Sequence, residues 1–419
     1  MEGIYNNEKL MDYRPLLHGR RVLIVGCGAV GSYVAEFCAK MGFSIDCVDM
    51  DRFTIENTAK HSALIRTPED SGRSKALATA QRVQVLLDTG CTAHGLDANV
   101  TRLGPEAYAD YEYVLLALDN YDAELVVNRQ LMELPQERQP KVIMAGTYGD
   151  LASSVGTDMS EFCIDCLIAD DWKETGYIHT SCTGPQIPHA SDGPIVQTSN
   201  TASATAAMLA VEQLRASALG LEEAKNRRIT YTAFPVLEID ISKPLKKRNC
   251  PSCTITPPDI HWLEGSVLDV KLRDALDMIA DELKTRDFEL SVARIKLHGI
   301  DYGAFVGDEV CAACGKPIHV YRHEVRTTEE DLLCEDCKTA GRGRCGQLPH
   351  PEPLRAFTFD TEEDILNMSL YSLGFPLGAH LEVLQREEDL GLLRIGNINH
   401  TIFSFADDHE KMHTVDKLD

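Results

Sequence analysis

Short apolar runs alternate with amphipathic stretches along the first half of the sequence. Residues 22–25 are apolar and rich in β-branched side chains, which predicts a buried strand, and a second strand is predicted at 45–48. Apolar residues recur at three- and four-residue steps over 74–88, which predicts a helix with one buried face. Residues 196–219 carry many alanines and few charges and predict a second, closely packed helix. This alternation is typical of an α/β fold around a largely parallel sheet.

Consecutive prolines at 257–258 interrupt this pattern, because two prolines in a row stop regular structure. Beyond them we expect an amphipathic helix at 266–285 and a strand at 288–297. A polypeptide of 419 residues is long enough for more than one domain. We therefore predict two, an α/β domain at 1–256 and a smaller α+β domain at 257–419.

A glycine-rich turn follows the first predicted strand. Gly26, Gly28 and Gly31 have the spacing G-x-G-x-x-G, which lets the backbone approach a phosphate while the next helix points unpaired N–H groups at it. The second strand delivers two carboxylates, Asp49 and Asp51, and Asp49 lies 23 residues after Gly26. Dinucleotide-binding folds place the acidic residue that holds the ribose at a similar distance. The pattern predicts a nucleotide site with NAD or FAD as the usual ligand; the alternative is a tight turn without a ligand.

The residues after the second strand favour a different nucleotide. Asn57, Lys60, Arg73 and Lys75 follow within a short segment that contains no further apolar strand. Cations beside a phosphate-binding turn suit a triphosphate with its metal better than a nicotinamide.

A third apolar strand is predicted at 114–118, and Asp119 follows it directly. In a parallel sheet the ligand site lies at the carboxyl ends of the strands, so we expect Asp119 at the same edge as the glycine turn. A carboxylate in this position is suited to hold Mg²⁺.

In their order along the sequence, these motifs resemble the adenylation domain of the ubiquitin-activating enzyme superfamily, whose simpler members are the ThiF and MoeB adenylyltransferases. The resemblance rests on the glycine loop, on Asn57 followed three residues later by a cation, and on the sequences DMD at 49–51, GRSK at 72–75 and LDN at 118–120. It covers roughly residues 15–255. It implies a Rossmann-like adenylation domain that binds ATP and Mg²⁺.

The resemblance also assigns roles to individual residues. Asp49 would hold the ribose, and Asp119 would hold the magnesium ion. Asn57, Lys60 and Lys75 would contact the triphosphate. Lys60 stands where the family usually has arginine; lysine keeps the charge but loses the bidentate fork of a guanidinium group.

Eight of the fourteen cysteines form four C-x-x-C pairs, which suits zinc bound by thiolates better than a disulfide framework. The third and fourth pairs have 19 residues between them, the local spacing of a zinc module at about 304–345; the alternative is a redox pair of reduced thiols. The first two pairs have 83 residues between them, and only the resemblance joins them around one zinc ion. The four pairs are Cys163/Cys166, Cys250/Cys253, Cys311/Cys314 and Cys334/Cys337.

Cys182 lies outside all four pairs, in a polar segment rich in Gly, Pro, Ser and Thr. Long segments of this kind are commonly functional loops. In the family that this sequence resembles, the loop after the mid-sequence C-x-x-C pair carries the cysteine that accepts the activated protein. The resemblance therefore implies that Cys182 is the acceptor, with Cys345 as the second candidate; the alternative is an exposed cysteine without a role.

The charge and the hydrophobic content limit the partners. The net charge of −24 argues against nucleic acid as a partner. We find no run of eighteen apolar residues and no leader with a cleavage site, so we expect a cytoplasmic protein without a membrane span. The acidic and histidine-containing residues at 407–413 are expected to fray.

The expected function is ATP-dependent activation of the C-terminal glycine carboxylate of a ubiquitin-like protein. The acyl group would then form a thioester on Cys182 and pass to a conjugating enzyme. The resemblance further implies a homodimer with ATP, Mg²⁺ and two Zn²⁺ ions per subunit. Three alternatives remain: a sulfur-carrier adenylyltransferase of thiamine or molybdopterin synthesis, a non-catalytic nucleotide-binding scaffold, and a tRNA-modifying dehydratase, which the acidic charge disfavours.

Overall fold

The computed structural model divides the protein into two compact units. Unit 1 contains the residues up to Val100, Tyr108–Pro257 and the residues from His413 on, and unit 2 contains Thr101–Ala107 and Pro258–Met412. The described residues are 13–418 except 56–59, 67, 120, 149–150, 168–197, 222–225, 233–235, 293–294, 298–299, 303, 324–329, 344, 346–353 and 387–397.

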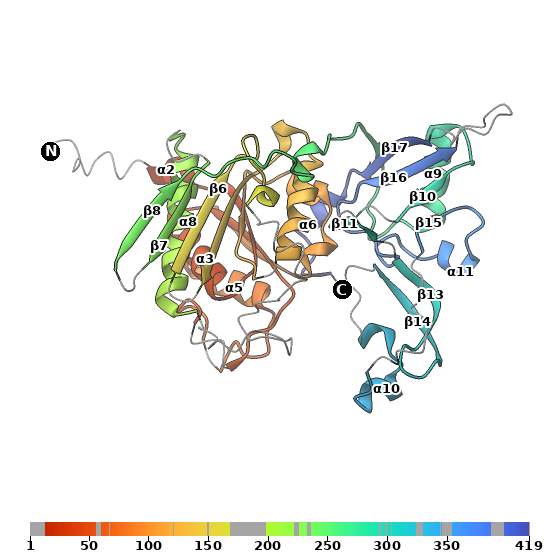
Figure 1. Ribbon diagram of the computed structural model, residues 1–419, viewed down its shortest axis with the longest axis horizontal. Coiled ribbons are helices and arrows are strands. Elements are labelled where there is room, and N and C mark those ends of the chain that lie inside the picture. The colour runs from red at the N-terminus through yellow and green to blue at the C-terminus, as the bar shows by residue number, and fades with distance from the viewer. Residues whose placement is uncertain are drawn as a thin grey trace. The chain divides into compact units, whose positions relative to one another are not determined.

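Unit 1 is built on a sheet of nine strands in the order β18-β3-β2-β1-β4-β5-β6-β7-β8 (Figure 1). The strands from β18 to β5 run parallel, and β6, β7 and β8 each pair antiparallel with the strand before them. This confirms the predicted α/β fold with a largely parallel sheet. The strands are β1 (Arg21–Val25), β2 (Ser44–Asp49), β3 (Ala93–Ala98), β4 (Tyr113–Leu116), β5 (Lys141–Tyr148), β6 (Leu151–Thr157), β7 (Arg228–Thr232), β8 (Glu238–Ser242) and β18 (Lys417–Leu418).

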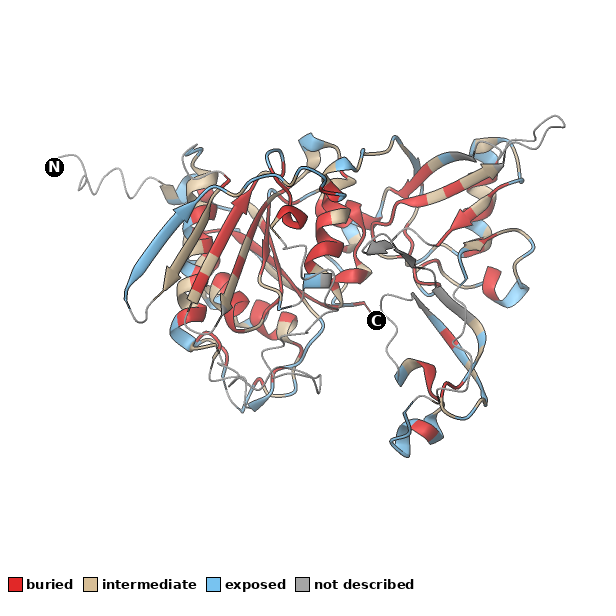
Figure 2. Ribbon diagram, in the orientation of Figure 1, coloured by how far each residue is buried: buried red, intermediate tan, exposed pale blue. Residues whose placement is uncertain are grey.

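Burial differs sharply across this sheet. All four residues of β4 are buried, as parallel strands are when both faces are covered, whereas all five residues of β8 at the sheet edge are exposed (Figure 2). The predicted strand at 114–118 is too long, since β4 ends at Leu116 and the backbone then turns toward the next helix.

The helices of unit 1 are α2 (Tyr13–Leu17), α3 (Ala29–Met41), α5 (Lys75–Val83), α6 (Tyr121–Met132) and α8 (Asn200–Ala218). The many small residues of α8 allow it to pack closely on α3, β5 and β6. The helix predicted at 74–88 is shorter than expected: α5 ends at Val83, and a 3-10 turn at 84–86 redirects the backbone toward β3.

Unit 2 contains a sheet of five strands in the order β15-β10-β16-β17-β9 and two separate two-stranded sheets. The predicted single strand at 288–297 is wrong, because β10 pairs with β15 and β16 while β11 pairs with β12 in another sheet. The elements are β9 (Ile260–Leu263), α9 (Leu272–Leu283), β10 (Glu289–Ser291), β11 (Ile295–Leu297), β12 (Ile300–Tyr302), β13 (Ala304–Val310), β14 (Pro317–His323), α10 (Glu335–Thr339), β15 (Ala356–Phe357), α11 (Glu363–Leu366), β16 (Leu381–Arg386), β17 (Ile398–Phe405) and α12 (Asp408–Lys411).

The residues at 407–413 do not fray as predicted. Asp408 in α12 is fully buried, and its carboxylate accepts hydrogen bonds from the N–H groups of Val267 at 3.0 Å and Gly378 at 2.9 Å. Farther on, β18 adds a strand to the edge of the sheet of unit 1, where it pairs with β3.

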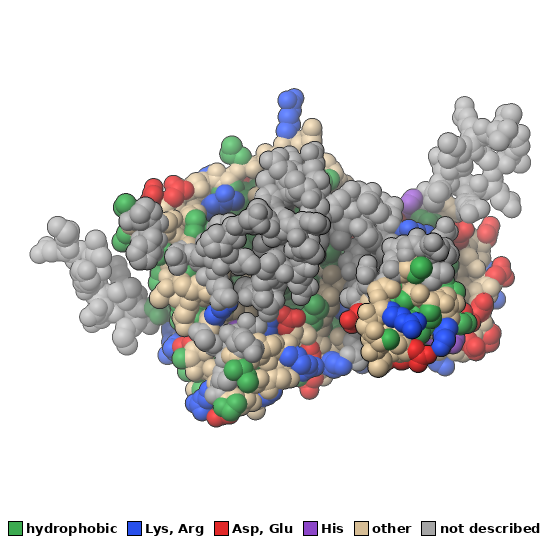
Figure 3. Space-filling view, turned by 60° about the horizontal axis from the view of Figure 1, so that its bottom comes forward, with side chains coloured by type: hydrophobic (Ala, Val, Ile, Leu, Met, Phe, Trp, Pro, Cys, Tyr) green, Lys and Arg blue, Asp and Glu red, His purple; other side chains and the backbone are tan. Residues whose placement is uncertain are grey.

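Two surface properties bear on partners. None of the described helices is both long and apolar enough to cross a bilayer. On the face shown in Figure 3, the acidic and basic side chains of the described residues lie interspersed.

Candidate functional site

The glycine turn between β1 and α3 is tightly packed on one side. Gly26 has a φ of 91°, and a Cβ there would lie 2.5 Å from the carbonyl oxygen of Ala117. A Cβ on Gly31 would lie 1.8 Å from the oxygen of Gly26, so the first turn of α3 presses against the loop. At Gly28, the N-cap of α3, a Cβ would meet no heavy atom of the described residues within 4 Å. The turn is thus open where helix N–H groups can bind an anion.

Asp49 joins the end of β2 to the glycine turn. Its Oδ2 accepts a hydrogen bond from the N–H of Cys27 at 2.6 Å, and its Oδ1 accepts one from the N–H of Asp51 at 2.8 Å. Burial raises the pKa of Asp49 to about 6, an effect that Lys75 opposes and Asp51 reinforces. The carboxylate therefore holds the loop in shape, and its contact with a ribose stays a prediction.

Lys75, the first residue of α5, reaches back to the end of β2. Its Nζ lies 2.8 Å from Asp51 Oδ2, and the lysine side chain is only 12% exposed. Burial alone would lower the pKa of Lys75, but the charges of Asp49, Asp51 and Asp119 raise it above its ordinary value. The fold thus places Lys75 close enough to Asp49, Asp51 and Asp119 for their charges to interact, although these predicted site residues come from separate segments.

Lys60 belongs to a loop that is fastened to α3. The N–H of Ser62 donates to Ser32 Oγ at 3.0 Å, and the hydroxyl of Ser62 donates to Glu36. Because Ser32 lies in the first turn of α3, these bonds keep the residues next to Lys60 near the glycine turn. The predicted phosphate contact of Lys60 stays a prediction.

Three other expectations have different outcomes. Asn57 and Cys182 lie outside the described residues. Arg73 is engaged elsewhere, because its guanidinium donates to Asp70 at 2.8 Å and to Gln81. These bonds hold Arg73 to the segment before α5, and its contact with a nucleotide stays a prediction.

Cys345, the second acceptor candidate, lies in unit 2 shortly after the four-cysteine module formed by Cys311, Cys314, Cys334 and Cys337. The residue is half-buried, and its N–H donates to the carbonyl oxygen of Ala312 at 2.8 Å. This contact fastens the Cys345 backbone to the first knuckle of that module.

Glu124 in the first turn of α6 is a carboxylate that sequence reasoning missed. It is 7% exposed, and its Oε2 has no hydrogen-bond partner among the described residues. Burial, and then the charge of Asp119, raises the pKa of Glu124 to about 8, so this carboxyl group is protonated at neutral pH. The sequence carries little signal for it, because an acidic residue in the first turn of a helix ordinarily serves the helix dipole.

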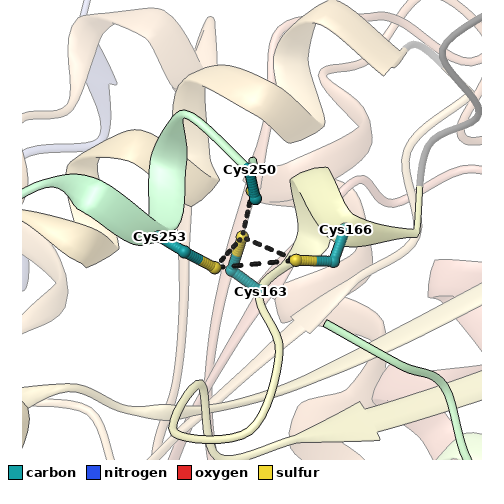
Figure 4. Close-up of side chains that lie close together, drawn as sticks. All are labelled: Cys163, Cys166, Cys250 and Cys253. Atoms are coloured by element: carbon teal, nitrogen blue, oxygen red, sulfur yellow. Dashed lines mark hydrogen bonds between the residues drawn. The ribbon is translucent and has the colours of Figure 1, made fainter. Parts of the chain in front are cut away.

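The first four-cysteine centre joins two distant C-x-x-C pairs (Figure 4). The sulfur of Cys163 lies 3.8 Å from that of Cys166 and 3.5 Å from that of Cys250, and the sulfurs of Cys166 and Cys253 are 3.6 Å apart. Four thiolates around zinc at about 2.3 Å would lie about 3.8 Å from one another, so the cluster fits the ion. A hydrogen bond from Cys163 lowers the pKa of the Cys250 thiol, and a thiolate is the form that binds a metal.

The two knuckles of this centre are also joined directly. They are the 3-10 turns η5 (Ile164–Cys166) and η7 (Ser252–Thr254). The hydroxyl of Ser252 donates to Asp165 Oδ2 at 2.9 Å, and both residues are buried. This bond fixes one knuckle against the other.

The second four-cysteine centre is local. One pair lies in the turn between β13 and β14, and Cys334 is the N-cap of α10. His319 on the hairpin pairs with Asp308 at 2.7 Å and is not among the clustered ligands. The four ligand atoms lie within 4.8 Å of one another and fit zinc as the sequence predicts; they belong to Cys311, Cys314, Cys334 and Cys337.

The sequence is similar to those of several known proteins. The profile of the ThiF family matches residues 11–254. The protein is 28% identical over 149 residues to a SUMO-activating enzyme subunit 2 of Dictyostelium discoideum, an alignment that covers 35% of the present sequence and 22% of that relative. It is 25% identical over 160 residues to an ATP-dependent ubiquitin transferase-like protein Cap2 of Vibrio cholerae, which covers 37% of the present sequence and 27% of that relative.

A third curated relative is the NEDD8-activating enzyme E1 catalytic subunit of Saccharomyces cerevisiae, with 27% identity over 136 residues, 31% of the present sequence and 44% of that relative. The alignments thus span less than half the length of each of these relatives. Among solved structures, E. coli MccB with ATP matches at a TM-score of 0.44 and 16% identity, covering 57% of the present protein and 68% of MccB.

Proposed function

Because this protein belongs to the ThiF family, we propose that it uses ATP to adenylate a carboxylate. The observation that carries the proposal is the group at the carboxyl edge of the sheet, where Lys75 lies in the field of Asp49, Asp51 and Asp119 beside an open glycine turn. A cation, helix N–H groups and carboxylates in one place suit a nucleotide triphosphate with its metal.

In the proposed reaction, an oxygen of the substrate carboxylate attacks the α-phosphorus of ATP. The bond to the bridging oxygen breaks, pyrophosphate leaves, and an acyl-adenylate forms. Lys75 would exchange Asp51 for the triphosphate and stabilise its growing charge. Asp119 would hold Mg²⁺, which neutralises phosphate charge when bound. Asp49 would hold the ribose while Asn57 and Lys60 contact the triphosphate.

The substrate that we propose is the C-terminal glycine of a ubiquitin-like protein. The names of two relatives, a SUMO-activating and a NEDD8-activating enzyme subunit, support this choice. The thiolate of Cys182 would attack the acyl carbon, release AMP and form a thioester for transfer to a conjugating enzyme. We further propose that 1–256 is the catalytic domain of a homodimer and that 257–419, with its own four-cysteine module, presents the ubiquitin-like protein or recruits the conjugating enzyme.

The first test is pyrophosphate exchange into ATP by the intact protein with a ubiquitin-like protein that ends in glycine. Asp119→Ala should reduce exchange by about 10²-fold or more, the loss expected when one charge-stabilising group is removed. Asp110→Ala is the matched control, because Asp110 is exposed and precedes the amino end of the same strand, β4. Binding of NAD without ATP would contradict the proposal.

The second test concerns the acceptor. Cys182→Ala should keep pyrophosphate exchange but lose the reductant-sensitive conjugate on a non-reducing gel. A conjugate that persists in Cys182→Ala and disappears in Cys345→Ala would move the acceptor role to Cys345. A thiocarboxylate product, formed with a sulfur donor, would instead favour the sulfur-carrier alternative.

A further inference from the structure

The helix α6 connects the acidic edge of the nucleotide site to the first four-cysteine centre. Asp119 lies two residues before the helix, and Glu124 lies in its first turn. Asn128 follows one turn after Glu124 and on the same face, because residues four apart are neighbours on a helix. The helix also packs against both metal knuckles, η5 and η7.

Asn128 uses both ends of its amide on one knuckle. The residue is completely buried, its Nδ2 lies 3.8 Å from Cys163 Sγ, and its Oδ1 accepts a hydrogen bond from the N–H of Ile164 at 2.9 Å. A single buried residue of α6 thus contacts a metal-binding sulfur and the backbone beside it.

We propose that Asn128 is a positioning residue that couples the Cys163–Cys166–Cys250–Cys253 centre to α6, so that the bound metal fixes the helix and the acidic residues at its start. The effect on catalysis rests on the function proposed above. The coupling itself does not depend on that function, since it concerns only the metal centre and the helix.

The coupling has its physical basis in the hydrogen bonds that Asn128 makes to the thiolate and to the backbone of the metal centre. Four thiolates around one Zn²⁺ carry excess negative charge, and a fixed N–H donor stabilises that charge and orients the sulfur. Without the amide, the N–H of Ile164 would also stay buried without its partner, which destabilises the knuckle. Because Asn128 is part of α6, the same two hydrogen bonds also fix the position of the helix relative to the metal centre. A helix released from Cys163 would move Glu124 relative to Asp119.

Ser252 provides the matched control. It also supports the metal centre, through its hydrogen bond to Asp165, but this bond joins knuckle to knuckle and leaves α6 out. Loss of either bond should loosen the metal. Only loss of the Asn128 bonds should loosen the helix.

The test compares Asn128→Ala, Asn128→Asp and Ser252→Ala in the intact, zinc-loaded protein. We expect all three to transfer zinc to a chromogenic chelator about 10- to 100-fold faster than the unchanged protein. The phase from the second four-cysteine centre serves as an internal reference and should not change. Asn128→Asp keeps the size of the side group and the acceptor for Ile164, so it covers the case in which Asn128→Ala fails to fold.

The second measurement is hydrogen exchange along α6. Both Asn128 variants should show faster exchange of its amides, and Ser252→Ala should not. In pyrophosphate exchange, we expect the Asn128 variants to raise the KM for Mg·ATP more than they lower kcat. Unchanged zinc release in both Asn128 variants, or the same α6 exchange in them as in Ser252→Ala, overturns the coupling. A protein without adenylation activity would refute the proposed function, while zinc release and hydrogen exchange would still decide the coupling.

Discussion

In the first four-cysteine centre, Cys163 and Cys250 are 87 residues apart, whereas Cys314 and Cys334 in the second are 20 residues apart. The first is enclosed by unit 1, with Asn128 of α6 against one sulfur. The second has a small hydrophobic core of its own and an exposed ligand, Cys314. Both centres therefore consist of four cysteines, but they join different lengths of sequence. The first centre connects distant segments of unit 1, and the second connects a hairpin to a short helix.

The largest expected effect comes from removing one ligand of each centre. Cys250→Ser should lower the free energy of unfolding of the whole of unit 1 by several kcal/mol, because metal binding is coupled to folding and this centre closes a long loop. Cys334→Ser should unfold only the β13–β14 module. The measurements are the zinc content and the hydrogen exchange of the amides in each unit. If either variant increased hydrogen exchange equally in both units, the two centres would not differ in the way described above.

A smaller effect is expected from glycines in the two regions. Gly31→Ala should destabilise unit 1 by about 3 kcal/mol and block nucleotide binding, since the new Cβ would overlap the oxygen of Gly26. Gly343→Ala, next to the second centre, should be almost neutral, because a Cβ there would meet nothing in the described residues within 4 Å. Denaturant midpoints and ATP binding check the pair. A nearly neutral Gly31→Ala would show that the glycine turn can relax.

The smallest expected effect is a pH dependence of the free energy of unfolding, which arises from a different buried carboxyl group in each unit. Burial raises the pKa of Asp49 in unit 1 and of Asp408 in unit 2 to about 6, above the ordinary value of 3.8. Each folded unit then binds more protons than its unfolded state between these values, so stability falls as pH rises from about 4 to about 6. Asp49→Asn should reduce this slope in unit 1 alone, where the raised pKa of Glu124 leaves a part of it, and Asp408→Asn should reduce it in unit 2 alone, as measured by hydrogen exchange at several pH values. A slope unchanged in both variants would assign the dependence to other groups.

Several features could be predicted because they are local. The glycine turn, the strands on either side of α3 and the C-x-x-C pairs each depend on residues close together in the sequence. β3 was missed because its sequence, AHGLDA, has neither a continuous apolar run nor a clear alternation. Glu124 and Asn128 were missed because their roles depend on Asp119 and Cys163, which lie outside the helix.

The sequence by itself determined the α/β class, the glycine-rich turn and the C-x-x-C pairs, since these follow from periodicity and short spacing. The grouping of the first two pairs came from resemblance and is confirmed by the structure. Only the tertiary structure decided that Lys75 lies in the field of three carboxylates, that Asn128 reaches the sulfur of Cys163 and that β18 pairs with β3. Such contacts form only when segments that are distant in the sequence come together. The burial of apolar surface across the whole unit offsets the entropy cost of closing the long loops between them, and a short segment of sequence does not show which distant segments will be neighbours.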